Sequence, residues 1–172
     1  MQDTEETALL TRVALGDRTA FRELYTLTSG RLFAIAKSML RQQAAAEDVL
    51  QDAYVKIWYS AAAFNPAKGE ALAWMITILR NLAIDRLRKT PPTDTDDDLG
   101  DTISDTPNLD EEHSRLQECL QALEASQRQS IFAAFFQGLT HMEISARFAE
   151  PIGTIKSRVR RGLSALKGCM EL

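Results

Sequence analysis

The sequence predicts an all-α fold with two small helical domains joined by a flexible acidic linker. Apolar residues recur at spacings of three and four along most of the 172-residue chain, and alternating β-branched runs are absent. The exception is 90–112, TPPTDTDDDLGDTISDTPNLDEE, which has three prolines, one glycine and nine acidic residues but no Lys or Arg. A segment of this composition cannot bury an apolar core. It therefore divides the chain into a domain at 1–89 and a domain at 113–172.

The net charge of −4 conceals an uneven distribution. Residues 1–89 carry 12 Lys and Arg against 10 Asp and Glu, and residues 113–172 carry 8 against 5. Both domains are therefore mildly basic, and the acidity belongs to the linker. A fully extended chain of the linker's length reaches about 75–80 Å. The two domains are therefore expected to be able to move apart by up to this distance.

Composition also narrows the class of protein. No apolar run approaches the roughly 20 residues that span a bilayer, and the acidic N-terminus does not resemble a secretory signal. Cys119 and Cys169 are too few and too widely spaced to suggest a disulfide framework, which favours a reducing cytoplasm. His113 and His141 have no nucleophile or ligand set near them. We therefore expect a cytoplasmic protein that is not an enzyme, with no metal, cofactor or small-molecule substrate.

The helical periodicity predicts individual helices in both domains. Asn65-Pro66 and Gly69 mark a loop before the last helix of the first domain. In the second domain, capping boxes at Ser126–Gln129 and Thr140–Glu143 mark helix starts, and Gly138 suits a helix C′ position. The predicted helices are 4–15, 18–28, 30–42, 46–60 and 70–89, then 110–124, 127–137, 141–148 and 154–168.

Residues 140–166 have the pattern of a helix-turn-helix motif. A short helix is followed by a turn through 150–153 and a longer helix, which Thr154 is expected to cap. Apolar residues and Gly162 share one side of that longer helix, and cations occupy the other. This suits a recognition helix that contacts guanine edges and phosphates, although an ordinary solvated basic face is the alternative. The apolar side has Ile155, Val159, Leu163 and Leu166; the opposite arc has Lys156, Ser157, Arg160, Arg161, Ser164 and Lys167, with Arg158 on its flank.

Two helix faces in the first domain are also unusual. On AEDVLQDAYVKIW (46–58), carboxylates surround an outward Val55, which is the mixed composition of a protein interface; a solvated face with one stray valine is the alternative. On 71–89, Trp74 lies beside amide and cationic groups and could stack an unpaired base, whereas a core role is the commoner one for a single Trp. The upstream loop 62–70 could complete a base pocket.

These motifs resemble the group IV (extracytoplasmic function, ECF) branch of the bacterial sigma-70 family. AEDVLQDAYVKIW is similar to the family's polymerase-binding region 2.2, and WMITILRNLAIDRLRK is similar to its regions 2.3 and 2.4. The stretch from Leu123 to Leu166 resembles region 4. The resemblance covers nearly the whole chain. It implies a region 2 helical bundle at 1–89 and a region 4 helix-turn-helix at 113–172.

The resemblance also implies roles for individual residues. One set should contact the clamp coiled coil of the polymerase β′ subunit: Asp48, Gln51, Asp52 and Val55. A second set should hold the flipped-out −10 strand: Phe64, Asn65, Trp74, Thr77 and Asn81, with Arg80, Arg86, Arg88 and Lys89 along its backbone. A third set should engage the −35 duplex: Thr154, Lys156, Ser157, Arg158, Arg160 and Arg161.

Two positions depart from the family pattern. Glu124-Ala125 stand where members usually have Leu-Pro, so that helix start is expected to differ slightly. Ala149-Glu150 stand where a Gly usually precedes the helix-turn-helix turn, and a left-handed backbone is harder to form without Gly.

The sequence therefore predicts an ECF-type sigma factor that places its domains on the −35 and −10 elements and helps to melt the −10 segment. The expected partners are core RNA polymerase (β′ clamp coiled coil and β flap), promoter DNA and an anti-sigma factor, with a monomer when free. An ordinary DNA-binding regulator and a helical adaptor that binds only proteins are the alternatives. Specific duplex binding by the free protein would favour the regulator. Salt-dependent DNA binding that is lost in Arg160→Ala or Arg161→Ala would exclude the adaptor.

Overall fold

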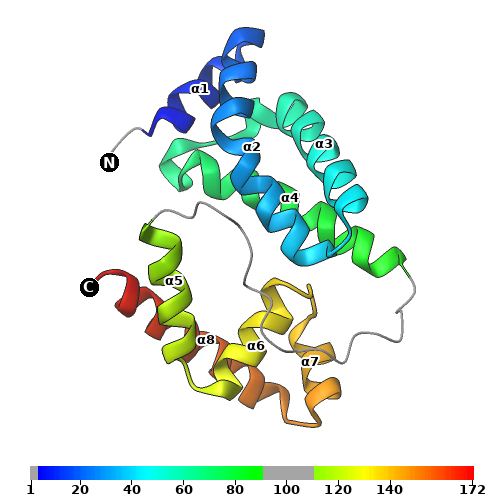
Figure 1. Cartoon of the computed structure of the whole chain (residues 1–172), viewed down its shortest axis with the longest axis vertical. Helices are drawn as coiled ribbons and strands as arrows, with labels where there is room; N and C mark the ends of the chain where they lie inside the picture. The colour runs from blue at the N-terminus through cyan, green and yellow to red at the C-terminus, as the bar shows by residue number, and fades with distance from the viewer. Residues whose placement is uncertain (1–3, 91–110) are drawn as a thin grey trace. The chain divides into compact units, whose positions relative to one another are not determined.

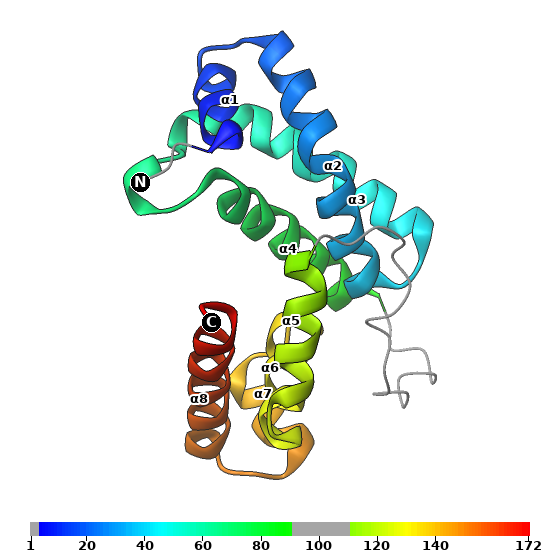
Figure 2. The same cartoon turned by 60° about the vertical axis from the view of Figure 1, so that its left-hand side comes forward.

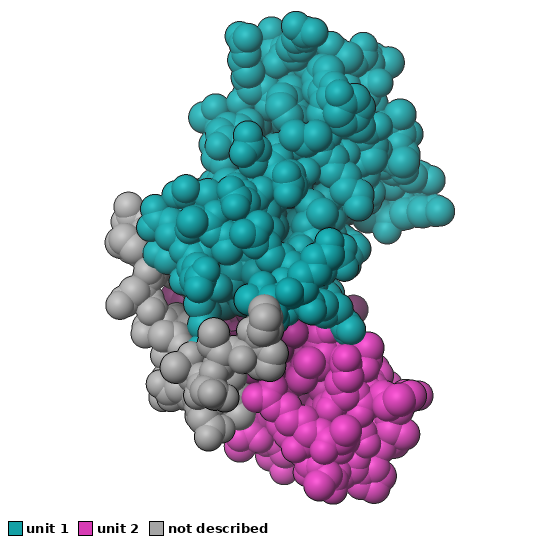
Figure 3. All heavy atoms as spheres, turned by 90° about the vertical axis from the view of Figure 1, so that its right-hand side faces the viewer, with its two compact units in different colours: residues 1–92 teal, residues 93–172 magenta. Residues whose placement is uncertain are grey.

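The computed structural model describes residues 4–90 and 111–172, with side chains of the second stretch from residue 114. Every regular element within these residues is a helix, which confirms the all-α fold class. The chain divides into two compact units, residues 1–92 and 93–172 (Figure 3). Of the predicted linker, 91–110 lie outside the described residues. The elements (Figure 1) are α1 Glu5–Ala14, α2 Arg18–Leu40, α3 Gln43–Ser60, η1 Ala61–Ala63, η2 Pro66–Lys68, α4 Ala71–Lys89, α5 Glu111–Ala122, α6 Ala125–Phe135, α7 His141–Phe148 and α8 Ile152–Met170.

In unit 1, α2 and α3 lie side by side and α4 packs against both (Figures 1 and 2). The two helices predicted at 18–28 and 30–42 are one helix, α2, which continues through Gly30. This prediction was wrong because the buried positions keep their helical spacing on both sides of the glycine. A continuous apolar stripe favours one helix more than an exposed glycine opposes it. The buried positions are Ala20, Leu24, Thr28, Leu32, Ala36 and Met39, of which all but Thr28 are apolar.

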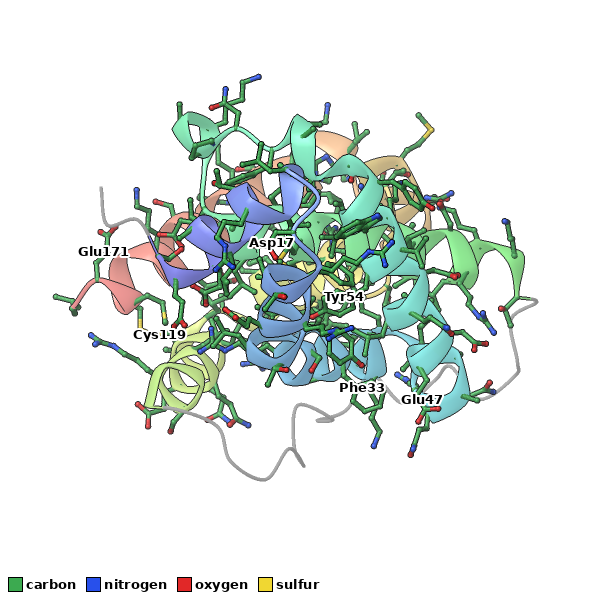
Figure 4. All side chains as sticks on the ribbon, turned by 90° about the horizontal axis from the view of Figure 1, so that it is seen from above. Asp17, Phe33, Glu47, Tyr54, Cys119 and Glu171 are labelled. Atoms are coloured by element: carbon green, nitrogen blue, oxygen red, sulfur yellow. A yellow bond between two sulfur atoms is a disulfide. The ribbon has the colours of Figure 1, made fainter. Side chains whose placement is uncertain are left out.

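One buried polar contact ties α2 to α3. The Thr28 hydroxyl donates to the backbone oxygen of Leu24 (2.7 Å), and it lies 2.6 Å from the Tyr54 hydroxyl. Because the single Thr28 proton is already used, Tyr54 is the donor in the second bond. Tyr54 (labelled in Figure 4) is a phenol, which is protonated at neutral pH even at its ordinary pKa, and burial raises its pKa further, to about 12. The bond therefore persists across the physiological pH range.

Helix starts in unit 2 follow the sequence pattern only in part. The capping box of α7 is confirmed: Thr140 N–H donates to Glu143 Oε2 (2.7 Å), and Glu143 N–H donates to Thr140 Oγ1 (3.2 Å). The box at Ser126 is wrong, since α6 begins at Ala125 with Glu124 as its N-cap and no side-chain cap. Gly138 has the expected left-handed backbone (φ 66°), one residue beyond the C′ position.

The turn of the helix-turn-helix is shorter than predicted. Helix α8 begins at Ile152 after the N-cap Pro151, so Thr154 lies in its first turn and does not cap it. Helix α7 ends at Phe148, and its C-cap Ala149 adopts the left-handed conformation (φ 52°, ψ 41°) that glycine usually takes. Ala149 therefore forms the same tight turn that glycine would form, but its left-handed backbone conformation is strained.

Helix α8 packs closely on α6 at Gly162. A Cβ at this position would lie 2.6 Å from Ile131 Cδ1 and 3.3 Å from Gln127 Cβ, so the predicted close packing is confirmed. Leu163, which was expected in the core, is 40% exposed instead. Because Gly162 faces α6, the neighbouring residue is turned toward the surface.

The wide sequence spacing of the two cysteines did not suggest a disulfide, but the structure contains one. Cys119 of α5 and Cys169 of α8 form a disulfide with a Cα–Cα distance of 5.9 Å (Figure 4). Helices α5 and α8 lie alongside one another and bring together residues that are 50 apart in sequence (Figure 2). Closing a loop of this length stabilises the folded unit by about 4 kcal/mol in the chain-entropy model. The cysteines therefore no longer support a reducing compartment.

No helix among the described residues is long and apolar enough to cross a membrane.

Gly162→Ala is expected to lower the free energy of unfolding of unit 2 by about 1–2 kcal/mol. Overpacking against Ile131 outweighs the gain in helix propensity, which is about 1 kcal/mol. The measurement is a urea titration followed by far-UV circular dichroism, with Trp fluorescence reporting unit 1, where both Trp residues lie. Gly168→Ala is the control: its Cβ meets nothing within 4 Å, so this change should stabilise α8. Equal stabilisation by both changes would contradict the packing described at Gly162.

Ala149→Gly is expected to stabilise unit 2 by about 0.5–1 kcal/mol. The left-handed backbone costs an L-residue about 1–2 kcal/mol, and this gain exceeds the extra chain entropy of glycine in the unfolded state. The same urea titration measures the change. Ala146→Gly, at an exposed interior position of α7, should instead destabilise by about 1 kcal/mol. Destabilisation by Ala149→Gly would show that the turn is not left-handed.

Candidate nucleic-acid interfaces

The N-terminal half of α8 carries three cations on its exposed face, and Lys167, paired with Glu171 at 3.8 Å, follows near the C-terminal end. Ile155 and Val159 are buried on the inner side of the helix, while the side chains of Lys156, Arg160 and Arg161 are exposed. Lys156 and Arg160 have no ion-pair partner among the described residues, and Arg161 donates only to the backbone oxygen of Ser157 (3.4 Å). Thr154 and Ser157 are half-buried at the edge of this face. The face therefore offers hydrogen-bond donors to an anionic surface.

Arg158 differs from these three cations. Its Nη2 lies 2.6 Å from Glu150 Oε2, and its Nη1 donates to Glu150 Oε1 at 2.7 Å. The Arg158 side chain is only 21% exposed. A bidentate pair of this kind holds both partners in fixed geometry.

The N-terminus of α8 has no side-chain cap. Its first hydrogen bonds run from Thr154 and Ile155 to the backbone oxygen of Pro151, so the N–H groups of Ile152 and Gly153 have no acceptor within the helix. Such an end attracts negative charge through its exposed N–H groups and its dipole. It lies next to Lys156 and extends the same cationic face.

In unit 1 the structure brings together two aromatic side chains that the sequence separates. The rings of Phe64, in the loop, and Trp74, on α4, have centroids 5.6 Å apart and are inclined by 55°. Both side chains are partly exposed, so Trp74 is not a fully buried core residue. Asn65 is exposed, and its Oδ1 accepts a bond from Ala67 N–H (2.9 Å) that shapes the loop. The other predicted neighbours, Thr77 and Asn81, are also exposed on α4.

The cations of α4 have unlike surroundings. Arg80 is partly buried, and burial lowers the pKa of its guanidinium. Arg86 lies 3.4 Å from Asp48 of α3, so the predicted DNA set and the predicted polymerase set touch at this point. Arg88 and Lys89 are exposed at the C-terminal end of the helix. The two terminal cations are therefore the most accessible to a phosphate backbone.

On α3 the four predicted polymerase contacts lie on one exposed face. Asp48, Gln51, Asp52 and Val55 are all exposed, and the Val55 side chain is 52% accessible. The helix buries its other side, including Val49, Ala53 and Ile57. Two carboxylates thus surround an exposed aliphatic side chain on a rigid helix.

An aromatic groove between α2 and α3 was missed by sequence reasoning. It has a volume of about 810 Å³, and Gln51 and Val55 line it together with several aromatic side chains. The rings of Phe21 and Trp58 pack edge to face at 5.2 Å, and Tyr59 is 82% exposed. The sequence signal was the helical spacing of aromatic residues in both helices. These aromatic residues are Phe21, Tyr25, Tyr54, Trp58 and Tyr59.

Among the described residues, no group of three His, Cys, Asp or Glu side chains could hold a metal ion.

Comparison with known proteins assigns both units. The sigma-70 region 2 model matches residues 24–91, and the sigma-70 region 4 model matches residues 113–166. The ECF RNA polymerase sigma factor SigK of Mycobacterium tuberculosis is 37% identical over 96% of this chain and 93% of its own length. The protein of the same name from Mycolicibacterium vanbaalenii is 35% identical over 95% of this chain and 88% of its own length.

A solved structure gives the same result for the fold. Rhodobacter sphaeroides SigE, crystallised in complex with the anti-sigma ChrR, is 30% identical to this chain and has a TM-score of 0.51. The alignment covers 95% of this chain and 99% of SigE. Two family models in the expected order, and relatives aligned over nearly the full chain, leave one assignment. The chain belongs to the ECF branch of the sigma-70 family of RNA polymerase sigma factors.

Proposed function

We propose that this sigma factor binds core RNA polymerase through α3. It captures the melted −10 strand with loop 62–70 and α4, and it contacts the −35 duplex with α8. The observation that carries the proposal is the pairing, in one chain, of an exposed acidic and aliphatic face in the region 2 unit with an exposed cationic face in the region 4 unit. Each face has the composition that its partner requires. An extended linker reach of about 75–80 Å is comparable to two turns of DNA, about 70 Å.

The polymerase interface centres on Asp48, Gln51, Asp52 and Val55. Exposed carboxylates complement cations on a partner, and Val55 supplies apolar contact between them. The aromatic groove continues this surface toward α2, since Gln51 and Val55 belong to both. The partner is the clamp coiled coil of the polymerase β′ subunit. Contact of the second unit with the β flap completes the proposed attachment.

The −10 interface is built on Phe64 and Trp74. Partly exposed rings that already contact each other form a preorganised platform on which an unstacked base gains stacking energy. Asn65, Thr77 and Asn81 supply hydrogen-bonding groups for the base edges. Arg80, Arg86, Arg88 and Lys89 lie along the same helix and follow the phosphate backbone.

The −35 interface is the outer face of α8. Lys156, Arg160 and Arg161 supply the charged donors, and Thr154 and Ser157 supply hydroxyl groups beside the open helix N-terminus. Arg158 adjoins this set with its guanidinium held by Glu150. Phosphate contacts position the helix, and side chains that reach the major groove read the bases.

We further propose that an anti-sigma factor controls this chain. The related R. sphaeroides SigE was crystallised in complex with the anti-sigma ChrR. An anti-sigma factor that covers the α3 face would prevent polymerase binding, so its release would switch transcription on. The protein itself acts as a transcription factor and carries out no covalent chemistry. It works in the cytoplasm as a monomer until it meets polymerase.

Asp52→Arg is expected to abolish binding to core polymerase, because it reverses the charge at the centre of the proposed interface. The measurement is co-purification of core polymerase with the tagged full chain. Circular dichroism should stay unchanged, since Asp52 is exposed. Glu23→Arg, an exposed carboxylate on α2 outside this face, is the control and should co-purify normally. Normal co-purification of Asp52→Arg would refute the interface.

Trp74→Ala is expected to weaken holoenzyme binding to the single non-template −10 strand by about 5- to 150-fold. Loss of one stacked base costs about 1–3 kcal/mol. The measurement is fluorescence anisotropy with a labelled strand from a promoter that the holoenzyme uses. Trp74→Phe should keep most of the affinity because it keeps an aromatic face. Equal binding by the wild type and Trp74→Ala would exclude a base-stacking role for Trp74.

A further inference from the structure

We infer that Arg158 is a positioning residue of the helix-turn-helix motif. Its guanidinium pairs with the carboxylate of Glu150 and does not contact DNA. The inference rests on the proposed function of α8 as the −35 reader. It separates Arg158 from its neighbours Lys156, Arg160 and Arg161, which share the same short cationic run in the sequence.

The geometry of the pair is the first argument. Both guanidinium Nη atoms engage both Glu150 carboxylate oxygens, at 2.6 and 2.7 Å. The side chains of Arg158 and Glu150 are 21% and 34% exposed, whereas Lys156, Arg160 and Arg161 lie exposed to solvent. A bidentate bond in partial shelter is retained better than a single bond in open solvent. Arg158 would have to break both bonds before its guanidinium could reach a phosphate.

Glu150 is itself held in place by the turn. The backbone N–H of Glu150 donates to the backbone oxygen of Ser145 (3.1 Å). The backbone oxygen of Glu150 accepts a bond from the Ser145 hydroxyl. Ala149, immediately before it, holds the left-handed bend of the turn. The backbone of Glu150 is therefore anchored to α7, and its carboxylate is bonded to Arg158 of α8.

The Glu150–Arg158 pair holds α7 and α8, the two helices of the motif, at a fixed angle. The orientation of the second helix decides which side chains reach base edges in the major groove. A rigid α7–Glu150–Arg158–α8 connection fixes that orientation without contributing a phosphate contact. Because Arg158 is paired with Glu150, the number of cations that contact phosphate is lower by one. This number can be measured from the salt dependence of DNA binding.

The test is the salt dependence of duplex binding by the full-length chain. Each phosphate neutralised by a cation contributes about 0.9 to the slope of log K against log salt concentration. Fluorescence anisotropy with a labelled mixed-sequence duplex of about 20 base pairs (two helical turns) gives this slope at low salt. Arg158→Gln should leave the slope unchanged. Glu150→Gln, which frees the guanidinium, should steepen the slope by up to about 0.9, and the double variant should return it to the wild-type value.

Arg160→Gln is the matched control, because Arg160 is an exposed cation two residues along the same helix. It should make the slope shallower by about 0.9. If Arg158→Gln makes the slope shallower by the same amount, Arg158 contacts DNA and the inference is overturned while the proposed function stands. If Arg160→Gln has no effect, the −35 assignment of α8 itself fails. Should Arg158→Gln unfold unit 2 by circular dichroism, an unchanged slope in Glu150→Gln alone overturns the inference.

Discussion

Every helix of this protein has to bury one apolar stripe inside a unit of fewer than about a hundred residues, and the rest of the structure follows from that constraint. In so small a unit a helix is covered on one side only. Helix α8 shows the result most clearly. With Ile155, Val159 and Gly162 turned inward, the cations at positions 156, 160 and 161 have no place except the surface. The close approach at Gly162 sets that rotation, because a larger residue there would collide with Ile131.

The same constraint produces the surfaces of unit 1. Helix α3 buries Val49, Ala53 and Ile57, and its opposite face carries two carboxylates around Val55. Helix α4 buries Met75 and Leu79 against the same core and leaves its polar side exposed. The buried bond between Thr28 and Tyr54 fixes α2 against α3 and so helps to shape the groove between them. The proposed interfaces are thus the outer sides of the core-forming helices.

Several features that depend on neighbouring residues were predictable from the sequence, although the capping box at Ser126 and the helix break near Gly30 were predicted wrongly. The all-α class, the bounds of α7 with its capping box, and the small residue at 162 all come from local periodicity and capping. Features that join distant positions were not. The Cys119–Cys169 disulfide and the aromatic groove between α2 and α3 exist because helix packing brings separated residues together. The pairing of Arg158 with Glu150 depends on the left-handed turn at Ala149, which an alanine in the sequence does not predict. Family resemblance named the residues of each interface, and their individual roles remain predictions.

The central claim is that this chain directs RNA polymerase to promoters, and reconstituted transcription tests it most directly. Purified core polymerase, with and without the full-length chain, would be given a library of promoter fragments, and run-off transcripts would be sequenced. The account predicts transcripts that depend on the chain and start downstream of fragments sharing a −35 and a −10 element. No promoter-dependent initiation above that of core polymerase alone would contradict it.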